Sequence, residues 1–167
     1  MNASTLLDTW TFSPIEWNTF VQFARKRKRS DHLYFGIGIF LIGIPVLMFF
    51  RNTSFLMALV FTIPFTLLVP WLRMKVSNSY LKETQLLAIV AFYSEYADMN
   101  GKKIVLYAKN KWIKDIRILT NDGQAILEIT VAWRTAKGNT NEELLFPIPN
   151  NKLEKAAELI TYYQNLS

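Results

Sequence analysis

The stretches LYFGIGIFLIGIPVLMFF (residues 33–50) and FLMALVFTIPFTLLVPWL (residues 55–72) decide the fold of this chain. Neither stretch contains Asp, Glu, Lys or Arg. At 1.5 Å of rise per residue, each would span about 27 Å as a helix, which is close to the hydrocarbon thickness of a bilayer. The short segment 51–54 allows only a tight turn between them. The sequence therefore predicts a transmembrane helical hairpin over residues 33–73.

Apolar stretches of this length also occur in soluble core helices and in signal peptides. A core helix of a soluble protein can be equally apolar, but two such runs in tandem without a charge argue against it. A cleaved signal peptide would place its apolar core nearer the N-terminus, and a second span would not follow it at once. A membrane hairpin therefore fits both stretches best.

Basic residues lie on one side of the predicted hairpin. The segment 25–29 precedes the first span, and Arg73, Lys75 and Lys82 follow the second, whereas the turn carries only Arg51. Cytoplasmic loops are enriched in Lys and Arg. We therefore expect two spans with both termini in the cytoplasm.

The basic run before the first span is a candidate membrane-surface site; it consists of Arg25, Lys26, Arg27, Lys28 and Arg29. One interpretation is topogenic, because basic residues retain the N-terminus inside. The other adds attraction to anionic lipid headgroups, about 1 kcal/mol per basic residue near the surface. The net charge of +6 alone would also suit nucleic acid, but the adjacent span makes lipid the nearer anion. No nucleic-acid partner is expected.

A helix is predicted to start just before this run. Ser13, Pro14 and Glu16 match a capping box with proline at the first helical position. Trp17 and Phe20 then begin an apolar stripe at helical spacing. Residues 1–32 are thus predicted to form a cytosolic amphipathic helix and a basic juxtamembrane segment. The stripe packs on lipid or on the tail; both interpretations stay open, with lipid slightly preferred.

The predicted spans also suggest how the two helices meet. Gly36 and Gly43 are seven residues apart and share a helix face, where a second helix can approach closely. Ion pathways and proton relays normally need charged residues inside the membrane, and neither span contains one. The hairpin is therefore interpreted as an anchor and not as a conduit.

After a connector over residues 74–84, the tail (85–167) changes to strand patterning. Asn100-Gly101 predicts a two-residue hairpin turn, and alternation is regular over 125–133. The prolines at 147 and 149 suggest an edge strand. Strands are expected at 87–96, 103–108, 111–119, 125–133 and 143–148, with a polar loop over 135–141 and a closing helix after Asn150 or Asn151. The predicted fold is a two-helix hairpin plus an α+β domain, an antiparallel sheet or barrel capped by a C-terminal helix.

A possible interaction surface lies in mid-tail and consists of Lys111, Trp112, Lys114 and Trp133. Trp112 is expected to share a face with Ile116 and Ile118, although Lys114 interrupts that apolar side. Core or interface positions suit the two tryptophans better than ligand-stacking roles. The scattered lysines, with Lys102, Lys103 and Lys109, suit a solvated surface first and lipid headgroups second.

Residues typical of catalysis are sparse. The chain has no cysteine and one histidine, His32, beside the first span. This excludes thiolate metal sites and cysteine nucleophiles, and we find no nucleophile elbow or phosphate-binding loop. No enzyme activity, cofactor or metal is expected.

The order of elements resembles the YcxB-like family of bacterial membrane proteins. The resemblance rests on Phe12-x-x-Ile15-Glu16-x-x-x-Phe20, on Asn100-Gly101-Lys102 with Trp112-Ile113-Lys114-Asp115-Ile116, and on Phe146-Pro147-Ile148-Pro149. It implies a pleckstrin-homology-like tail with about seven strands, in a protein of the bacterial cytoplasmic membrane.

The sequence thus predicts a non-enzymatic, membrane-anchored protein whose cytosolic domain associates with copies of itself or with a larger membrane complex. Its partners would be membrane lipids and a protein or a second copy. An anionic-lipid-sensing module is the alternative, and a subunit of a transporter or channel is the third.

Overall fold

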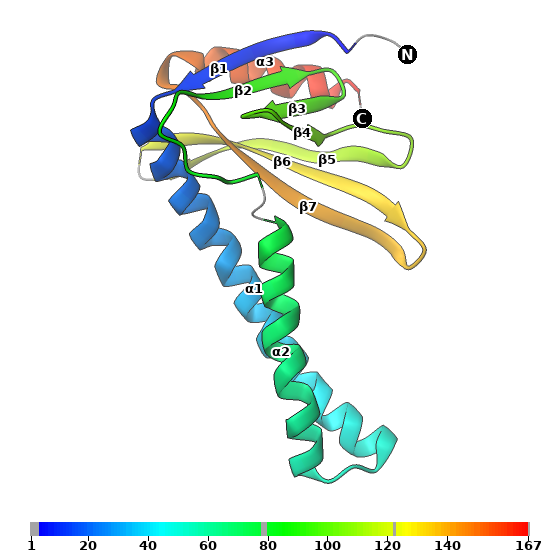
Figure 1. Cartoon of the computed structure of the whole chain (residues 1–167). Coiled ribbons are helices and arrows are strands. Elements are labelled where there is room, and N and C mark those ends of the chain that lie inside the picture. The colour runs from blue at the N-terminus through cyan, green and yellow to red at the C-terminus, as the bar shows by residue number, and fades with distance from the viewer. Residues whose placement is uncertain (1–3, 78–79, 122, 167) are drawn as a thin grey trace. The chain divides into compact units, whose positions relative to one another are not determined.

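The computed structural model describes residues 4–77, 80–121 and 123–166. The chain divides into two compact units (Figure 1). A strand-rich unit contains residues 1–20 and 83–167, and a helical unit contains residues 21–82. The helical unit is therefore an insertion within the strand-rich unit. The boundaries predicted from the sequence differ from this division; they were 1–32, 33–73, 74–84 and 85–167. They differ because the prediction put the N-terminal residues and the tail in separate domains.

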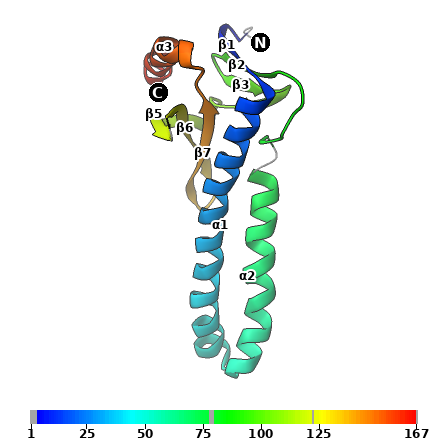
Figure 2. The same cartoon turned by 90° about the vertical axis from the view of Figure 1, so that its left-hand side faces the viewer.

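Two long helices, α1 (Pro14–Arg51) and α2 (Phe55–Ser77), run antiparallel in the helical unit (Figure 2). Both are long and apolar enough to cross a membrane, as the sequence predicted. Only 6% of the most apolar stretch of α1 and 11% of that of α2 are buried. A core helix of a soluble protein would be mostly buried, so these helices expose their apolar side chains instead.

The start of α1 follows the predicted capping box. The backbone N–H of Ser13 donates to the Glu16 carboxylate at 2.9 Å, and the Glu16 N–H donates back to the Ser13 hydroxyl at 3.3 Å. These hydrogen bonds lower the pKa of Glu16. From Pro14 the helix continues without a break through the basic run into the apolar stretch.

The strand-rich unit contains two antiparallel sheets and a C-terminal helix, which confirms an α+β layout. The first sheet has the order β1-β2-β3-β4, and the second has the order β5-β6-β7. The elements are β1 (Leu6–Phe12), β2 (Ala88–Tyr93), β3 (Tyr96–Met99), β4 (Lys102–Val105), β5 (Lys111–Asn121), β6 (Gln124–Thr135), β7 (Gly138–Pro147), the 3₁₀ turn η1 (Asn150–Lys152) and α3 (Leu153–Gln164).

One turn and one edge strand agree with the sequence. Asn100 and Gly101 have φ values of 53° and 80° and join Met99 to Lys102, as a two-residue hairpin turn requires. β7 lies at the edge of its sheet, where Pro147 needs no ladder hydrogen bond.

Three predictions for the strands were wrong. No strand was predicted within residues 1–32, yet Leu6–Phe12 form β1 and pair with β2. The predicted strand 87–96 is two strands, β2 and β3, separated by a short turn. The predicted polar loop 135–141 is the tip of a hairpin, in which Thr135 pairs with Gly138. Gly138 has a φ of 118°, which lets the chain reverse there.

Aromatic side chains form much of the core of the strand-rich unit. Phe92 of β2 packs edge-on against Trp10 of β1, with ring centroids 4.6 Å apart, and against Phe146 of β7 at 5.2 Å. Trp17 and Phe20 of α1 are fully buried in the same unit, and Trp17 lies 6.0 Å from Phe12. The slight preference for placing this stripe in lipid was therefore wrong for these two residues.

Candidate interaction site

The structure separates the five residues of the basic run. Consecutive helical residues project about 100° apart, so five of them point in all directions around the helix. Arg25 donates to the carbonyl oxygen of Leu81 from Nε at 3.1 Å and from Nη2 at 2.8 Å. Lys28 is buried and donates to the Tyr80 hydroxyl. Both side chains therefore hold the segment that follows α2.

The remaining three basic residues differ in exposure. Lys26 and Arg29 are exposed, and Arg27 is half-buried. Only the first two are fully available to a headgroup.

The predicted packing glycines lie against α2. A Cβ atom at Gly36 would stand 3.1 Å from Pro70 Cγ and 3.2 Å from the Thr66 carbonyl oxygen. At Gly43 it would stand 3.0 Å from Thr62 Cγ2. These approaches leave no room for a larger side chain without a shift, so α2 packs closely against both glycines.

The mid-tail surface predicted from Lys111, Trp112, Lys114 and Trp133 is not a single surface. A β-bulge in β5 between Ile113 and Asp115 takes up Lys114. Lys111 pairs directly with Trp133, and its Nζ lies 5.5 Å from that ring's centroid. Trp112 pairs with Ala132 and therefore points to the opposite face.

The bulge also changes which β5 residues share the core face. Ile113, Ile116 and Ile118 face the same side, because the extra residue restores their alternation. The predicted grouping of Trp112 with Ile116 and Ile118 was wrong for this reason. Burial lowers the pKa of the Lys111 ammonium, and the charge of Glu142 offsets part of that shift.

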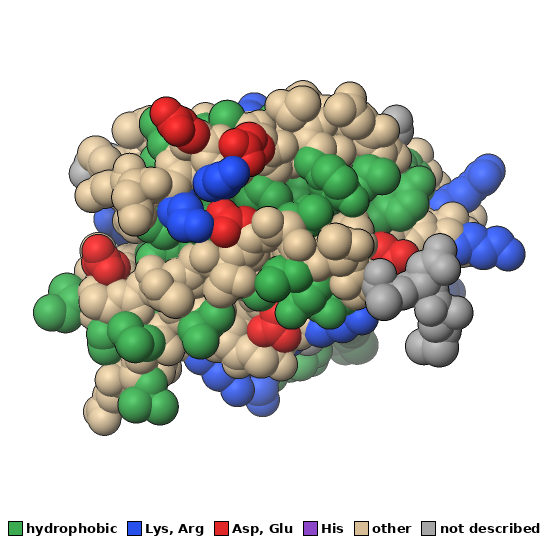
Figure 3. All heavy atoms as spheres, turned by 90° about the horizontal axis from the view of Figure 1, so that it is seen from above, with side chains coloured by type: hydrophobic (Ala, Val, Ile, Leu, Met, Phe, Trp, Pro, Cys, Tyr) green, Lys and Arg blue, Asp and Glu red, His purple; other side chains and the backbone are tan. Residues whose placement is uncertain are grey.

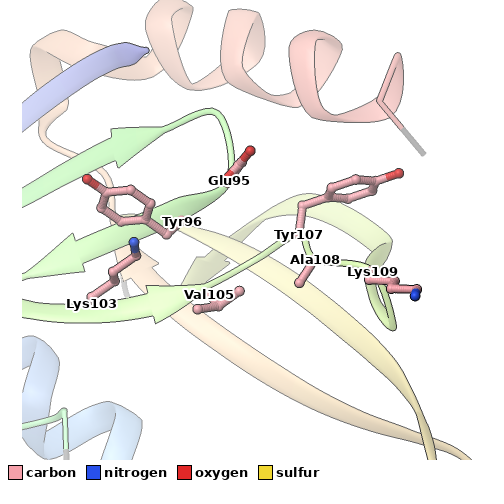
Figure 4. Close-up of a pocket in the computed structure, with 7 residues that line it drawn as sticks. All are labelled: Glu95, Tyr96, Lys103, Val105, Tyr107, Ala108 and Lys109. Atoms are coloured by element: carbon pink, nitrogen blue, oxygen red, sulfur yellow. The ribbon is translucent and has the colours of Figure 1, made fainter. Parts of the chain in front are cut away.

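A pocket of about 340 Å³ lies on the strand-rich unit, which we call the tyrosine hollow (Figure 4). Its lining comes from the turn between β2 and β3, from β3, from β4 and from the segment that joins β4 to β5. The lining residues are Glu95, Tyr96, Lys103, Val105, Tyr107, Ala108 and Lys109. Both lysines belong to the basic region visible in the sequence, but the tyrosines were indistinguishable there from ordinary strand residues.

Aromatic and basic groups define the chemistry of the tyrosine hollow. Lys103 reaches toward Tyr96, with Nζ 3.8 Å from the ring centroid (Figure 4). Tyr96 also stacks on Tyr93 at 4.4 Å with the rings 17° from parallel. Val105 and Tyr107 are 37% and 41% exposed. The hollow can thus accept an apolar or aromatic side chain beside a negatively charged one.

Charge and hydrophobic surface are mixed elsewhere on this unit. The view from above shows hydrophobic patches between charged side chains of both signs (Figure 3). Within residues 4–77, 80–121 and 123–166, no three His, Asp or Glu side chains come together as metal ligands. The chain matches no protein-family model, no curated protein and no solved structure.

Proposed function

We propose that this chain is a non-enzymatic, membrane-anchored protein whose strand-rich unit mediates association with other proteins. The tyrosine hollow carries this proposal. It offers exposed aromatic and aliphatic surface with lysines at its rim, and aromatic side chains are enriched at the centres of protein interfaces.

The strand-rich unit is proposed to be a pleckstrin-homology-like domain, as the YcxB-like resemblance implies. Seven strands in two antiparallel sheets of four and three, followed by a helix, support this assignment among the described residues. In the proposal, the helical hairpin is inserted between the first and second strands of that domain.

The helical unit is proposed to anchor the chain in the bacterial cytoplasmic membrane. Large apolar patches on a soluble surface are rare, which favours lipid as the solvent for α1 and α2. Basic residues flank the apolar stretches at the end remote from the turn, which supports the proposal that both termini are cytoplasmic. Reporter fusions at both termini should be active only as cytosolic reporters, and a periplasmic signal from either would overturn this orientation.

Crosslinking in native membranes tests the association itself. We expect the chain, extracted in mild detergent, to crosslink into discrete species with a second copy or another protein. Tyr107→Asp places a charge in the hollow and should reduce these species about tenfold, the effect of 1.4 kcal/mol. Leu153→Asp is the matched control, because Leu153 is 51% exposed on α3 and does not line the hollow. A strictly monomeric protein without crosslinks would refute the proposal.

Anionic-lipid sensing is the second candidate, and exposed basic residues of the helical unit favour it. They include Lys26 and Arg29 on α1 and Arg73 and Lys75 on α2. The Arg73 guanidinium lies 4.8 Å from the Phe35 ring centroid, and Lys75 Nζ lies 5.3 Å from that of Trp71. Aromatic and basic side chains together are typical of membrane–water interfaces.

Lipid analysis tests this second candidate. The chain is reconstituted in nanodiscs that contain phosphatidylcholine and phosphatidylglycerol, and the lipids that it retains are measured by mass spectrometry. Phosphatidylglycerol should be enriched, and added salt or Arg73→Gln should weaken the enrichment because both reduce electrostatic attraction. Equal retention of the two lipids at every salt concentration would exclude it.

A further inference from the structure

The outer edge of β4 offers backbone hydrogen-bonding groups beside the tyrosine hollow. β4 is the last strand of its sheet in the order β1-β2-β3-β4. In an antiparallel pair, hydrogen-bonded and non-hydrogen-bonded residue pairs alternate. The backbone N–H and C=O groups of successive β4 residues therefore point alternately toward β3 and away from it. The two-residue turn makes Met99 and Lys102 a hydrogen-bonded pair, so Ala97 and Ile104 form the next one.

The intervening residues of β4 point their backbone groups the other way. Lys103 and Val105 occupy the non-hydrogen-bonded positions opposite Asp98 and Tyr96. Their N–H and C=O groups therefore face away from β3. The register continues beyond Val105, where the N–H of Leu106 donates to the Glu95 carbonyl oxygen at 2.9 Å. A strand laid along this edge would form about four backbone hydrogen bonds.

Side chains at the same two positions line the hollow. Lys103 and Val105 share the sheet face of Tyr96, because paired residues in an antiparallel sheet point to the same side. A strand that pairs with β4 would thus place alternate side chains over the tyrosine hollow. This combination of backbone pairing and side-chain pockets is the general basis of recognition by strand addition.

Charge selects among the possible occupants of this edge. Lys102 and Lys103 lie on β4, and Lys109 lies in the hollow. A second copy pairing through its own β4 would bring Lys102 and Lys103 of both copies together along one short edge, where like charges repel. Of the nearby acids, Asp98 already accepts from the Gly101 N–H at 2.7 Å, and Glu95 lines the hollow. An acidic strand meets complementary charge here.

We infer that β4 is a docking edge for an extended, acidic segment of a partner protein, which pairs with Lys103 and Val105 and fills the tyrosine hollow. This inference rests on the proposed association function and names the chemistry of the partner. The same lysines disfavour the joining of two copies of the chain through this edge.

Photocrosslinking of the full chain in native membranes identifies the occupant. A benzoylphenylalanine replaces Tyr107, and the crosslinked peptide is sequenced by mass spectrometry. We expect one segment of another protein, rich in Asp and Glu and without helical periodicity. A crosslink to lipid, to a second copy of this chain or to nothing would overturn the inference.

Proline substitution tests the backbone pairing. Val105→Pro removes an outward N–H without touching the β3–β4 ladder, since proline is tolerated at such edge positions. It should reduce the crosslink about tenfold. Asn139→Pro is the matched control, because Asn139 holds the equivalent outward position on β7, opposite Arg134. An undiminished crosslink in Val105→Pro would overturn the inference, although the association function would stand.

Charge substitution tests the same edge if the proline variant is misfolded, as tryptophan fluorescence would show. Lys103→Glu should reduce the crosslink about tenfold, and Lys103→Arg should preserve it. Equal crosslinking by both variants would overturn an acidic partner.

Discussion

Asn18 and Thr84 are joined by two hydrogen bonds on either side of the inserted helical unit. The Asn18 side-chain amide donates to the Thr84 carbonyl oxygen at 3.1 Å, and the Thr84 N–H donates to Asn18 Oδ1 at 3.0 Å. Asn18 lies just before the chain leaves the strand-rich unit, and Thr84 lies just after it returns. This pair closes the strand-rich unit at the place where the helical unit interrupts it.

Asn18→Ala should therefore weaken the strand-rich unit. It removes two hydrogen bonds, each worth about 1 kcal/mol, so we expect a loss of about 2 kcal/mol in the free energy of unfolding. The fluorescence of the buried Trp10 and Trp17 follows the transition. Asn139→Ala, at an exposed position, should change it by less than about 0.5 kcal/mol. Equal effects of the two substitutions would contradict this role for Asn18.

Asp8 links the first strand to the turn before α3, and its contribution should depend on pH. Its Oδ1 accepts from Lys152 Nζ at 2.9 Å, and its Oδ2 accepts from the Trp10 indole at 2.8 Å. Burial raises the pKa of Asp8, but hydrogen bonds from Lys152, Trp10 and Thr9 outweigh it, so the pKa falls below 3.8.

A lowered folded-state pKa means that this stabilisation is complete above the unfolded-state value of 3.8 and disappears as the pH falls through the folded-state pKa. Asp8→Asn should thus cost about 1 kcal/mol at neutral pH. The difference between the two proteins in denaturant unfolding should shrink in strong acid. A difference that grows on acidification would show that another group controls the effect.

Gly36→Ala and Gly38→Ala should have opposite effects on the helical hairpin. Alanine favours a helix over glycine by about 1 kcal/mol at either position. At Gly36 the new methyl group would press on the Thr66 carbonyl oxygen and on Pro70, whereas at Gly38 it meets nothing within 4 Å. Overpacking costs about 1–3 kcal/mol, so Gly36→Ala should be net destabilising.

Helix separation during titration with SDS measures this difference. The chain has no cysteine, so dyes can be attached to cysteines introduced at the exposed residues Leu33 and Leu72. The helices should separate at a lower SDS fraction in Gly36→Ala and not in Gly38→Ala. Coincident curves would mean that the close approach at Gly36 is unimportant.

The stability of the strand-rich unit should depend on the ion pair between the Glu128 carboxylate and Arg117. Glu128 is 1% exposed in the middle of β6, and it accepts from Arg117 Nε at 2.8 Å. Removing one partner of a buried charge pair costs more than neutralising the buried group. Arg117→Gln should therefore lower the thermal midpoint more than Glu128→Gln does. Asp115→Asn serves as the control, since Asp115 is 54% exposed and 3.9 Å from Arg117. The reverse order would contradict this dependence.

Local patterns predicted much of this fold. The charge-free stretches give α1 and α2, and Asn100-Gly101 with the regular alternation of β6 gives the hairpins. β1 escaped prediction because a register shift between Leu6 and Asp8 leaves only a short alternating run. Its partner strand is also far away in sequence. Lys114 was recognised as an interruption, but only the pairing with β6 shows that a bulge absorbs it.

The candidate site was less predictable than the fold. Its lysines were visible as a basic region, but nothing in the sequence groups Tyr96 with Tyr107. Both line the hollow because the β3–β4 hairpin and the segment that follows it border the same pocket. For the basic run, the sequence grouped residues that the structure separates. Its composition suggested one lipid-facing surface, whereas helical geometry turns Arg25 and Lys28 toward the segment after α2.

Because the helical unit is inserted between β1 and β2, the first sheet cannot form until the whole helical unit has been synthesised. Phe12 pairs with Ala88, so the first strand leaves the ribosome long before its neighbour exists. At about 5–20 residues per second, the delay across these 76 positions is about 4–15 s. During that time Trp10 and Phe12 cannot be covered by β2. β1 therefore completes its sheet late, and newly made chains are most open to proteases and chaperones along this strand.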